Sequence, residues 1–234
     1  MHRILICNSK GGSGKSTIAT NLAGYFAHSG NSTALLDYDP QGSAIKWLSQ
    51  RPKEKPAICG VAAFKNRQDL TRAWQLNIPS KADWVIMDAP AGVSGFRLAD
   101  FVQRVDTVVI PVLPSPIDIH ATTNFIKDLL LVGKARHFGT NIAVLANRVK
   151  ENTRMFKQLR FFLASLEVPY VATFRESQDY IRAAEQGLSI HELAKPRAMV
   201  SCDQWQPLLA WLQNLPQRRI NEPLNNIFPL WAKG

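Results

Sequence analysis

Cysteine, long apolar runs and acidic residues are all scarce in this 234-residue sequence. The three cysteines, Cys7, Cys59 and Cys202, are widely scattered, so they offer neither a disulfide framework nor the spacing of a metal site. No apolar run reaches the roughly 18–20 residues that a membrane-spanning helix needs. The first apolar stretch begins almost at Met1, without the features of a secretory signal peptide. These absences predict a cytoplasmic protein that is not exported.

The shortage of acidic residues leaves a large positive charge. Asp and Glu number 18 against 28 Lys and Arg, which gives a net charge of +10. A solvated basic surface that only aids solubility is one interpretation. A polyanionic partner, such as DNA or an acidic membrane, is the other. The total charge alone does not decide between them.

Short apolar runs alternate with longer amphipathic segments, which is the pattern of βα units and a mainly parallel sheet. We therefore expect an α/β fold, a single-domain, doubly wound sheet flanked by helices, over residues 1–216. The expected strands are Arg3–Asn8, Ser32–Asp37, Ala57–Ala62, Trp84–Asp88, Thr107–Val112, Asn141–Asn147 and Pro169–Thr173. The expected helices are Lys15–Ser29, Ser43–Ser49, Arg67–Leu76, Gly95–Arg104, Ile117–Val132, Thr153–Leu166, Gln178–Gln186 and Arg197–Gln213. The tail, residues 217–234, contains two Pro and three Asn, so we expect it to be non-helical.

The strongest local signal is the sequence KGGSGKST, from Lys10 to Thr17, which follows an apolar strand and opens a helix. Glycines let successive backbone N–H groups turn towards phosphate oxygens, and the helix N-terminus adds the positive end of its dipole. Lys15 would neutralise the β- and γ-phosphates, and the Ser16 hydroxyl would bind Mg²⁺. We therefore expect ATP and Mg²⁺ as ligands. The predicted nucleotide-binding residues of this loop are Gly11, Gly12, Ser13, Gly14, Lys15, Ser16 and Thr17.

Two further strands end in aspartate. Asp37 and Asp39 lie two residues apart at the end of the second expected strand, so they share one face. Both could point towards the phosphate loop, where Mg²⁺ and Lys15 would offset their repulsion; two turn-forming aspartates before Pro40 are the alternative. Asp88 ends the apolar strand WVIMD, in the manner of a carboxylate that contacts Mg²⁺ through water. Many strands end in aspartate, so Asp88 alone is a weak signal. The position of its strand after a phosphate loop makes the signal strong.

Together these motifs resemble the deviant Walker A ATPases of the ParA/MinD family. The resemblance covers about Arg3 to Leu193 and is strongest to the small ParA proteins. It rests on Lys10 at the first position of the phosphate loop, on the DYDPQGS segment that begins at Asp37, and on PVLPSPID at 111–118. It implies a slow ATPase that dimerises around ATP, with PVLPSPID near the dimer interface.

The resemblance also implies a role for individual residues. Lys10, which could otherwise be an exposed strand-end lysine, would cross the dimer interface to the partner's nucleotide. Asp39 would orient or activate the attacking water, and Asp37 would support the site near Mg²⁺. Asn147, followed by Arg148, would meet the adenine, since an amide offers a paired donor and acceptor; a turn-forming Asn is the alternative. The predicted catalytic residues are therefore Lys10, Lys15 and Asp39, and the predicted metal ligands are Ser16, Asp37 and Asp88.

Much of the positive charge lies between Lys127 and Arg160, where there are eight basic residues and two acidic ones. Three of the basic residues fall on roughly one face of an expected helix. Others lie in a segment similar to the region with which family members bind DNA non-specifically. Such residues hold the phosphate backbone of double-stranded DNA without reading bases, so the affinity would be salt-sensitive. The predicted DNA-binding residues are Arg154, Lys157, Arg160, Arg175, Arg182, Lys195 and Arg197.

The resemblance implies that the ATP-bound homodimer binds the nucleoid and that an adaptor protein on a cargo stimulates hydrolysis. Plasmid or chromosome partition is the leading interpretation, with carboxysomes or chemotaxis clusters as other cargo. A MinD-like membrane switch is the alternative, but Pro229 and the Asn-rich run before it oppose the amphipathic C-terminal helix that membrane binding would require. An iron–sulfur reductase of the same superfamily is excluded, because no cysteine follows the Asp88 motif where a cluster would need one.

Overall fold

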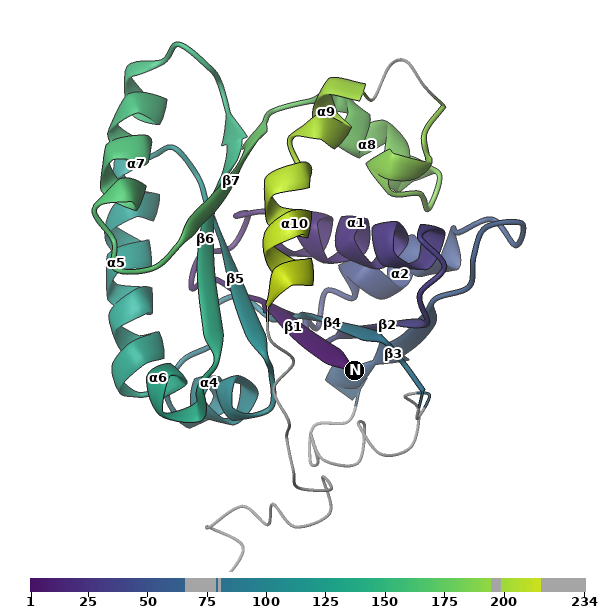
Figure 1. The fold of residues 1–234 in the computed structure, drawn as a ribbon, viewed down its shortest axis with the longest axis horizontal. Helices are drawn as coiled ribbons and strands as arrows, with labels where there is room; N and C mark the ends of the chain where they lie inside the picture. The colour runs from purple at the N-terminus through teal and green to yellow at the C-terminus, as the bar shows by residue number, and fades with distance from the viewer. Residues whose placement is uncertain (66–78, 80, 195–198, 216–234) are drawn as a thin grey trace, which may run out of the picture.

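The fold is organised around one sheet of seven strands. The computed structural model describes residues 1–65, 79, 81–194 and 199–215. The strands are β1 (His2–Ile6), β2 (Thr33–Asp37), β3 (Cys59–Ala62), β4 (Trp84–Asp88), β5 (Thr107–Val112), β6 (Asn141–Val149) and β7 (Tyr170–Arg175). Their order across the sheet is β3-β2-β4-β1-β5-β6-β7, and every pairing is parallel (Figure 1). The prediction of a doubly wound α/β sheet is confirmed.

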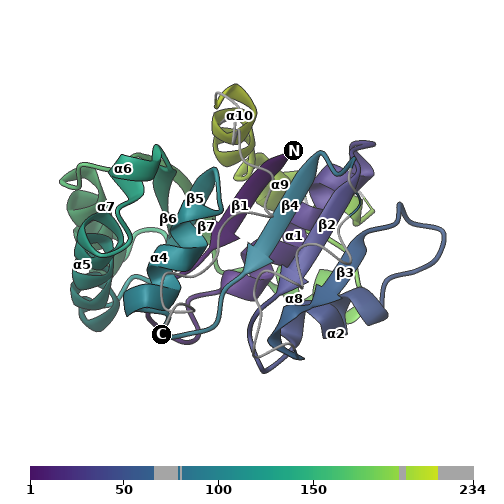
Figure 2. The same ribbon diagram turned by 90° about the horizontal axis from the view of Figure 1, so that it is seen from below.

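Helices cover both faces of this sheet (Figures 1 and 2). One face carries α1 (Lys15–His28), α2 (Ser43–Ser49), α8 (Gln178–Glu185), α9 (Met199–Asp203), α10 (Gln206–Asn214) and the 3₁₀ turn η2 (Ile190–Glu192). The other face carries α4 (Gly95–Gln103), α5 (Pro116–Leu131), α6 (Ala135–Phe138) and α7 (Arg154–Ala164). A second 3₁₀ turn, η1 (Ala63–Lys65), follows β3. In the part of the chain that the structure describes, no helix is long and apolar enough to cross a membrane.

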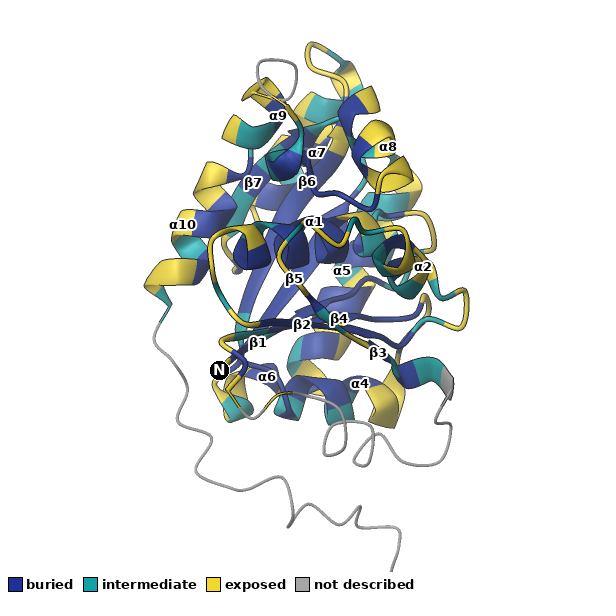
Figure 3. Cartoon of the chain, turned by 90° about the vertical axis from the view of Figure 1, so that its right-hand side faces the viewer, coloured by how far each residue is buried: buried dark blue, intermediate teal, exposed yellow. Residues whose placement is uncertain are grey.

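Side chains of the strands contribute to two apolar cores, one on each face of the sheet. In β1, Ile4 and Ile6 pack towards α1, while Leu5 between them packs on the opposite side. Successive strand residues point to opposite faces, and both faces of this sheet are covered, so the strands are buried almost throughout. Figure 3 shows the buried strands between helices whose outer surfaces are exposed. The carboxyl ends of the strands, and the loops that follow them, are therefore left to form a site.

Each expected strand is present, with ends that differ by no more than two residues. The single helix expected at Arg197–Gln213 is wrong, because the described part of that segment forms two helices, α9 and α10. Pro207 lies in the first turn of α10, where its missing N–H is tolerated. Deeper in one continuous helix it would remove a hydrogen bond and clash with the preceding turn. The expected helix at 67–76, the domain end at 216 and the tail at 217–234 lie outside the described residues.

A buried ion pair ties the end of α2 to the segment that follows α8. The Arg51 guanidinium contacts the Glu192 carboxylate at 2.6 Å, and their side chains are 5% and 0% exposed. Arg51 also donates a hydrogen bond to the Gly187 carbonyl, and Trp47 Nε1 donates to the Leu188 carbonyl. Together with the hydrogen bond from the Ile190 N–H to Asn21 Oδ1 of α1, these contacts hold the segment from Gly187 to Glu192 against both α1 and α2.

We expect Glu192→Gln to destabilise the protein strongly, by about 3–5 kcal/mol, because it leaves the Arg51 charge buried without its counterion. Urea unfolding followed by circular dichroism measures this loss. Glu167→Gln is the matched control, since the Arg136–Glu167 pair has side chains 69% and 83% exposed. Exposed pairs of this kind contribute about 0–1 kcal/mol. Equal, small effects of the two changes would contradict a structural role for the buried pair.

Candidate functional site

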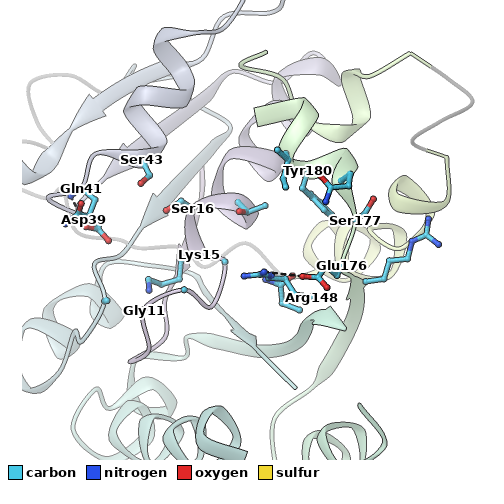
Figure 4. Close-up of a pocket in the computed structure, with 18 residues that line it drawn as sticks. Gly11, Lys15, Ser16, Asp39, Gln41, Ser43, Arg148, Glu176, Ser177 and Tyr180 are labelled. Atoms are coloured by element: carbon cyan, nitrogen blue, oxygen red, sulfur yellow. Dashed lines mark hydrogen bonds and ion pairs between the residues drawn. The ribbon is translucent and has the colours of Figure 1, made fainter. Parts of the chain in front are cut away.

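A cavity of about 610 Å³ opens at the carboxyl edge of the sheet, beside β1. The sheet extends from β1 to β3 on one side and to β7 on the other, and ligands of open α/β sheets bind at such a reversal of strand order. Figure 4 shows the lining, with Asp39 and Gln41 at one end, Lys15 and Ser16 in the middle, and Arg148, Glu176 and Tyr180 at the other. The topology thus brings residues from both halves of the sequence into one site.

The phosphate loop joins β1 to α1, and most of its predicted residues line the cavity. Those residues are Gly11, Gly12, Gly14, Lys15, Ser16 and Thr17, whereas Ser13 is fully buried behind them. Gly14 adopts φ 92° as α1 begins, a left-handed conformation that favours glycine. Asn147 at the end of β6 also lines the cavity, but its amide N–H₂ donates to the Ser13 carbonyl at 2.8 Å. Asn147 therefore fixes the loop, and its contact with adenine stays a prediction.

We expect Gly14→Ala to destabilise the ligand-free protein by about 1–3 kcal/mol. A Cβ at Gly14 would lie 2.2 Å from Asn147 Nδ2, in addition to the strain of a positive φ. Thermal unfolding of the ligand-free protein measures the effect. Gly11→Ala is the matched control, because a Cβ at Gly11 meets no atom within 4 Å and its φ is not positive. A loss of stability that is as large in the Gly11 variant would contradict this explanation.

The two lysines of the loop have different surroundings. Lys15 is buried and lines the cavity, and its ammonium donates to the Lys10 carbonyl at 3.0 Å. Burial lowers the pKa of Lys15, while the nearby Asp88 and Asp39 carboxylates oppose that shift. Lys10 is half-buried and does not belong to the lining of the cavity. Its side chain is therefore not committed to this protomer's own site, and its role across an interface stays a prediction.

Asp37, the last residue of β2, and Asp39, two residues later, have different surroundings. Asp39 lines the cavity, where one carboxylate oxygen accepts a hydrogen bond from the Gln41 N–H at 3.0 Å. Asp37 is fully buried, and its oxygens accept hydrogen bonds from the N–H groups of Asp39, Ala44 and Ile45. Those bonds hold the turn and the first residues of α2. Asp37 is thus engaged by the main chain rather than exposed to the cavity, and its predicted contact with metal is untested.

Asp88, at the end of β4, is a buried carboxyl group that interacts with Ser16 and Lys15 of the phosphate loop. Among the described residues, neither of its oxygens makes a hydrogen bond of good geometry, although the Ser16 hydroxyl is close enough to interact with the carboxylate. Burial raises the pKa of Asp88 to about 7, while the neighbouring Ser16 hydroxyl and Lys15 ammonium oppose the shift. Within the described residues, no three His, Cys, Asp or Glu side chains converge into a complete metal site. The binding of Mg²⁺ by Ser16 and Asp88 stays a prediction.

The opposite end of the cavity comes from β7 and the start of α8, a segment that the motifs did not identify as nucleotide-binding. Its lining residues are Arg175, Glu176, Ser177, Gln178, Tyr180 and Ile181. Arg148, which has φ 51°, forms an ion pair with Glu176 at 3.2 Å, and this pair bounds the cavity. Ser177 caps α8 by accepting a hydrogen bond from the Asp179 N–H. Ser177 could have been recognised in the sequence as the start of a helix. Its position beside the phosphate loop, however, follows only from the order of the strands in the sheet.

The predicted DNA-binding residues do not form one continuous surface. Arg154, Lys157 and Arg160 are exposed on α7, whereas Arg182 is exposed on α8, in the layer on the other face of the sheet (Figure 1). Arg175, at the end of β7, lines the cavity. Lys195 and Arg197 lie outside the described residues. The single basic stripe suggested by the sequence is therefore divided by the sheet, and DNA contact by any of these residues stays a prediction.

Comparisons with known proteins agree with this geometry. Residues 4–190 match the model of the CobQ/CobB/MinD/ParA nucleotide binding domain. "Maintenance of carboxysome distribution protein A" of Halothiobacillus neapolitanus is 29% identical over 81% of this chain and 87% of its own length. The protein of that name from Gloeobacter kilaueensis is 30% identical over 80% and 82%.

Two solved structures share the fold at low sequence identity. A putative plasmid partition protein from Borrelia burgdorferi, bound to AMPPNP, superposes with a TM-score of 0.70 at 18% identity, over 90% of this chain and 99% of that one. The MinD cell division protein of Aquifex aeolicus superposes with a TM-score of 0.68 at 17% identity, over 94% and 100%. At these identities, the likeness concerns the fold.

Proposed function

This chain belongs to the CobQ/CobB/MinD/ParA family of nucleotide-binding proteins, and from that premise we propose that it hydrolyses ATP to position a cargo. In this proposal the protein dimerises around ATP, binds double-stranded DNA non-specifically in that state, and is reset when an adaptor protein stimulates hydrolysis. The observation that carries the catalytic part is that the phosphate loop and Asp39 line one cavity, while the buried Asp88 carboxylate interacts with Ser16 and Lys15 of that lining.

Each part of the cavity has a task in this proposal. The N–H groups of the phosphate loop and the start of α1 would hold the phosphates, and Lys15 would exchange the Lys10 carbonyl for a phosphate oxygen. Ser16 and Asp88 would hold Mg²⁺, which supplies positive charge at the β- and γ-phosphates. Such an ion normally keeps several waters and needs only one or two protein carboxylates. Asp39 would orient the attacking water, and Asp37 would support Asp39 through the turn that it binds.

Exposed apolar side chains near the same edge support the proposed dimer. Phe96, in the first turn of α4, is 96% exposed, and Ile117, in the first turn of α5, is 68% exposed. The loop before α4 lies against the phosphate loop, because the Gly92 N–H donates a hydrogen bond to the Ser9 carbonyl. A second copy facing this edge would cover both apolar residues and meet Lys10 of the first.

We assign the proposed DNA contact to the α8 side of the molecule. Ile181 of α8 lines the cavity, so a nucleotide bound there would lie next to the helix that carries the exposed Arg182. No residue of α7 belongs to the lining. A surface next to the nucleotide site is better suited than α7 to change its DNA affinity when ATP binds. A dimer would present that surface twice, which would increase the affinity for DNA.

The names of the relatives bear on the cargo. Two relatives, each aligned with this chain over more than four fifths of its own length, are named for the maintenance of carboxysome distribution. A chromosome-partitioning ATPase, Soj of Thermus thermophilus, matches over only 22% of this chain. We therefore place a carboxysome ahead of a plasmid or chromosome as the proposed cargo, which reverses the order expected from the sequence.

We expect duplexes of unrelated sequence to bind with ATP and Mg²⁺ but weakly with ADP, in an electrophoretic mobility shift assay. Affinity should fall steeply with salt, because binding releases counterions from the phosphates. Arg182→Glu should weaken DNA binding at least about tenfold while leaving ATP-dependent dimerisation intact. Arg136→Glu is the matched control, as Arg136 is exposed in the opposite layer. Equal affinity with ADP and ATP would contradict the switch, and binding to anionic vesicles instead would favour a membrane-associated role.

A further inference from the structure

The outer face of α7 carries a large aromatic side chain that the fold does not use. Phe161 is 81% exposed, whereas Leu159 and Leu163 of the same helix are buried in the core against β6 and α5. In an α-helix, residues three, four and seven positions apart share a face. Arg154 and Lys157 precede Phe161 by seven and four residues, so all three lie together on the solvent side of α7. The aromatic ring therefore lies near the C-terminal end of the exposed face, next to the cations that precede it.

Among the described residues, no acidic side chain forms an ion pair with the cations of this face. The sequence of α7, RMFKQLRFFLA, contains no acidic residue. Among the residues that the structure describes, Arg154, Lys157 and Arg160 form no ion pair, although other exposed arginines, such as Arg136 and Arg148, do. An exposed aromatic ring with several cations on one side of it is complementary to a ligand that carries acidic groups next to an apolar side chain.

We propose that this α7 face, which includes Phe161, binds an acidic segment of a partner protein that places an apolar side chain against the aromatic ring. The inference rests on the proposed function, in which an adaptor protein acts on this ATPase, and it assigns the adaptor a surface and a chemistry. The face lies away from the nucleotide cavity, because no α7 residue lines it. An adaptor bound there would leave ATP, Asp39 and α8 accessible.

Two other polyanions fit this face less well. Duplex DNA would use the cations, but its phosphate backbone offers nothing apolar to Phe161 and needs no aromatic residue. An anionic membrane would attract the cations too, yet membrane-surface helices insert a broad apolar face. The broad apolar face of α7, with Leu159 and Leu163, is already buried in the core, which leaves Phe161 as its one large exposed apolar residue.

Fluorescence anisotropy with labelled synthetic peptides tests the proposal on the full-length protein. One peptide is rich in Asp and Glu with a single central leucine, and a second replaces that leucine with serine. We expect the first to bind at least about tenfold more tightly than the second, since anchor residues of an interface carry most of its affinity. Phe161→Ser should remove that difference, and Arg154→Glu with Lys157→Glu should abolish binding of both peptides. Gln158→Ala, on the same exposed face, is the control that should leave both affinities unchanged.

The alternative outcomes each count against the proposal. Equal binding of the two peptides, or an unchanged preference in Phe161→Ser, would make α7 a surface for any polyanion. Binding to phosphatidylglycerol vesicles that is lost in Phe161→Ser, with no peptide binding, would make it a membrane contact. Failure of both peptides to bind would also overturn it. In each case, ATP hydrolysis and ATP-dependent DNA binding by the same preparation show whether the proposed function survives on its own.

Discussion

Asp39→Ala should still bind ATP and Mg²⁺ but should turn it over at least about 100-fold more slowly than the parent protein, so that the ATP-bound dimer accumulates. Asp39 is the carboxylate of this turn that lines the cavity, facing the phosphate loop, and a residue that orients the attacking water acts mainly in the transition state. Its removal should therefore lower kcat with little change in nucleotide affinity.

The fold should tolerate this change. Among the described residues, the Asp39 carboxylate accepts one hydrogen bond, from the Gln41 N–H, and this bond lies in an exposed turn. The turn itself is held by Asp37 through the Asp39 N–H, which alanine retains. Phosphate release with saturating ATP measures turnover, and a fluorescent ATP analogue measures binding. The contrasting variant is Lys15→Ala, which should weaken nucleotide binding itself, because the buried ammonium would lose its contact with the phosphates.

Turnover at the parental rate in Asp39→Ala would remove Asp39 from the catalytic role. Loss of nucleotide binding in that variant would instead show that the carboxylate, like Lys15, holds the substrate. The two variants together separate binding from catalysis, since only one of them should change the affinity.

The sequence was sufficient to predict the sheet and the phosphate loop because their signals are local. An apolar run such as WVIMD can be buried on both faces only as a central strand, and KGGSGKST places its glycines where a strand turns into a helix. The signal for the break between α9 and α10 is also local, because it comes from Pro207. A proline is favoured in the first turn of a helix, so Pro207 could have predicted the start of a new helix rather than the continuation of one long helix.

The rest of the site depends on contacts between residues distant in sequence. Asp37 and Asp39 are equivalent as a pattern, but the N–H groups of α2 engage one and leave the other facing the cavity. Asn147 carries the amide expected of a base-binding residue, yet its donor is occupied by a carbonyl 134 positions away. The basic residues of α7 and α8 look continuous along the chain and are separated by the sheet. Only the topology determines these outcomes.

Lys10→Ala should bind ATP as a monomer and should fail both to dimerise and to hydrolyse it, with turnover reduced at least about 100-fold. The expectation follows from where Lys10 lies. Its main chain belongs to the phosphate loop, since its N–H donates to Asn8 Oδ1 and its carbonyl accepts from Lys15. Its side chain is half-buried and does not line its own cavity. Alanine keeps the main-chain contacts, so nucleotide binding by the isolated protomer should survive.

Light scattering after size-exclusion chromatography, with ATP and Mg²⁺, distinguishes the possible outcomes. The parent protein should shift from monomer to dimer, and Lys10→Ala should remain monomeric while retaining bound ATP. Lys46→Ala is the matched control, because Lys46 is an exposed lysine of α2 that does not line the cavity. This variant should dimerise normally. A normal ATP-dependent dimer in Lys10→Ala would make Lys10 an ordinary surface lysine. In that case dimerisation would depend on other contacts of this edge, of which the exposed Phe96 and Ile117 are the first to test.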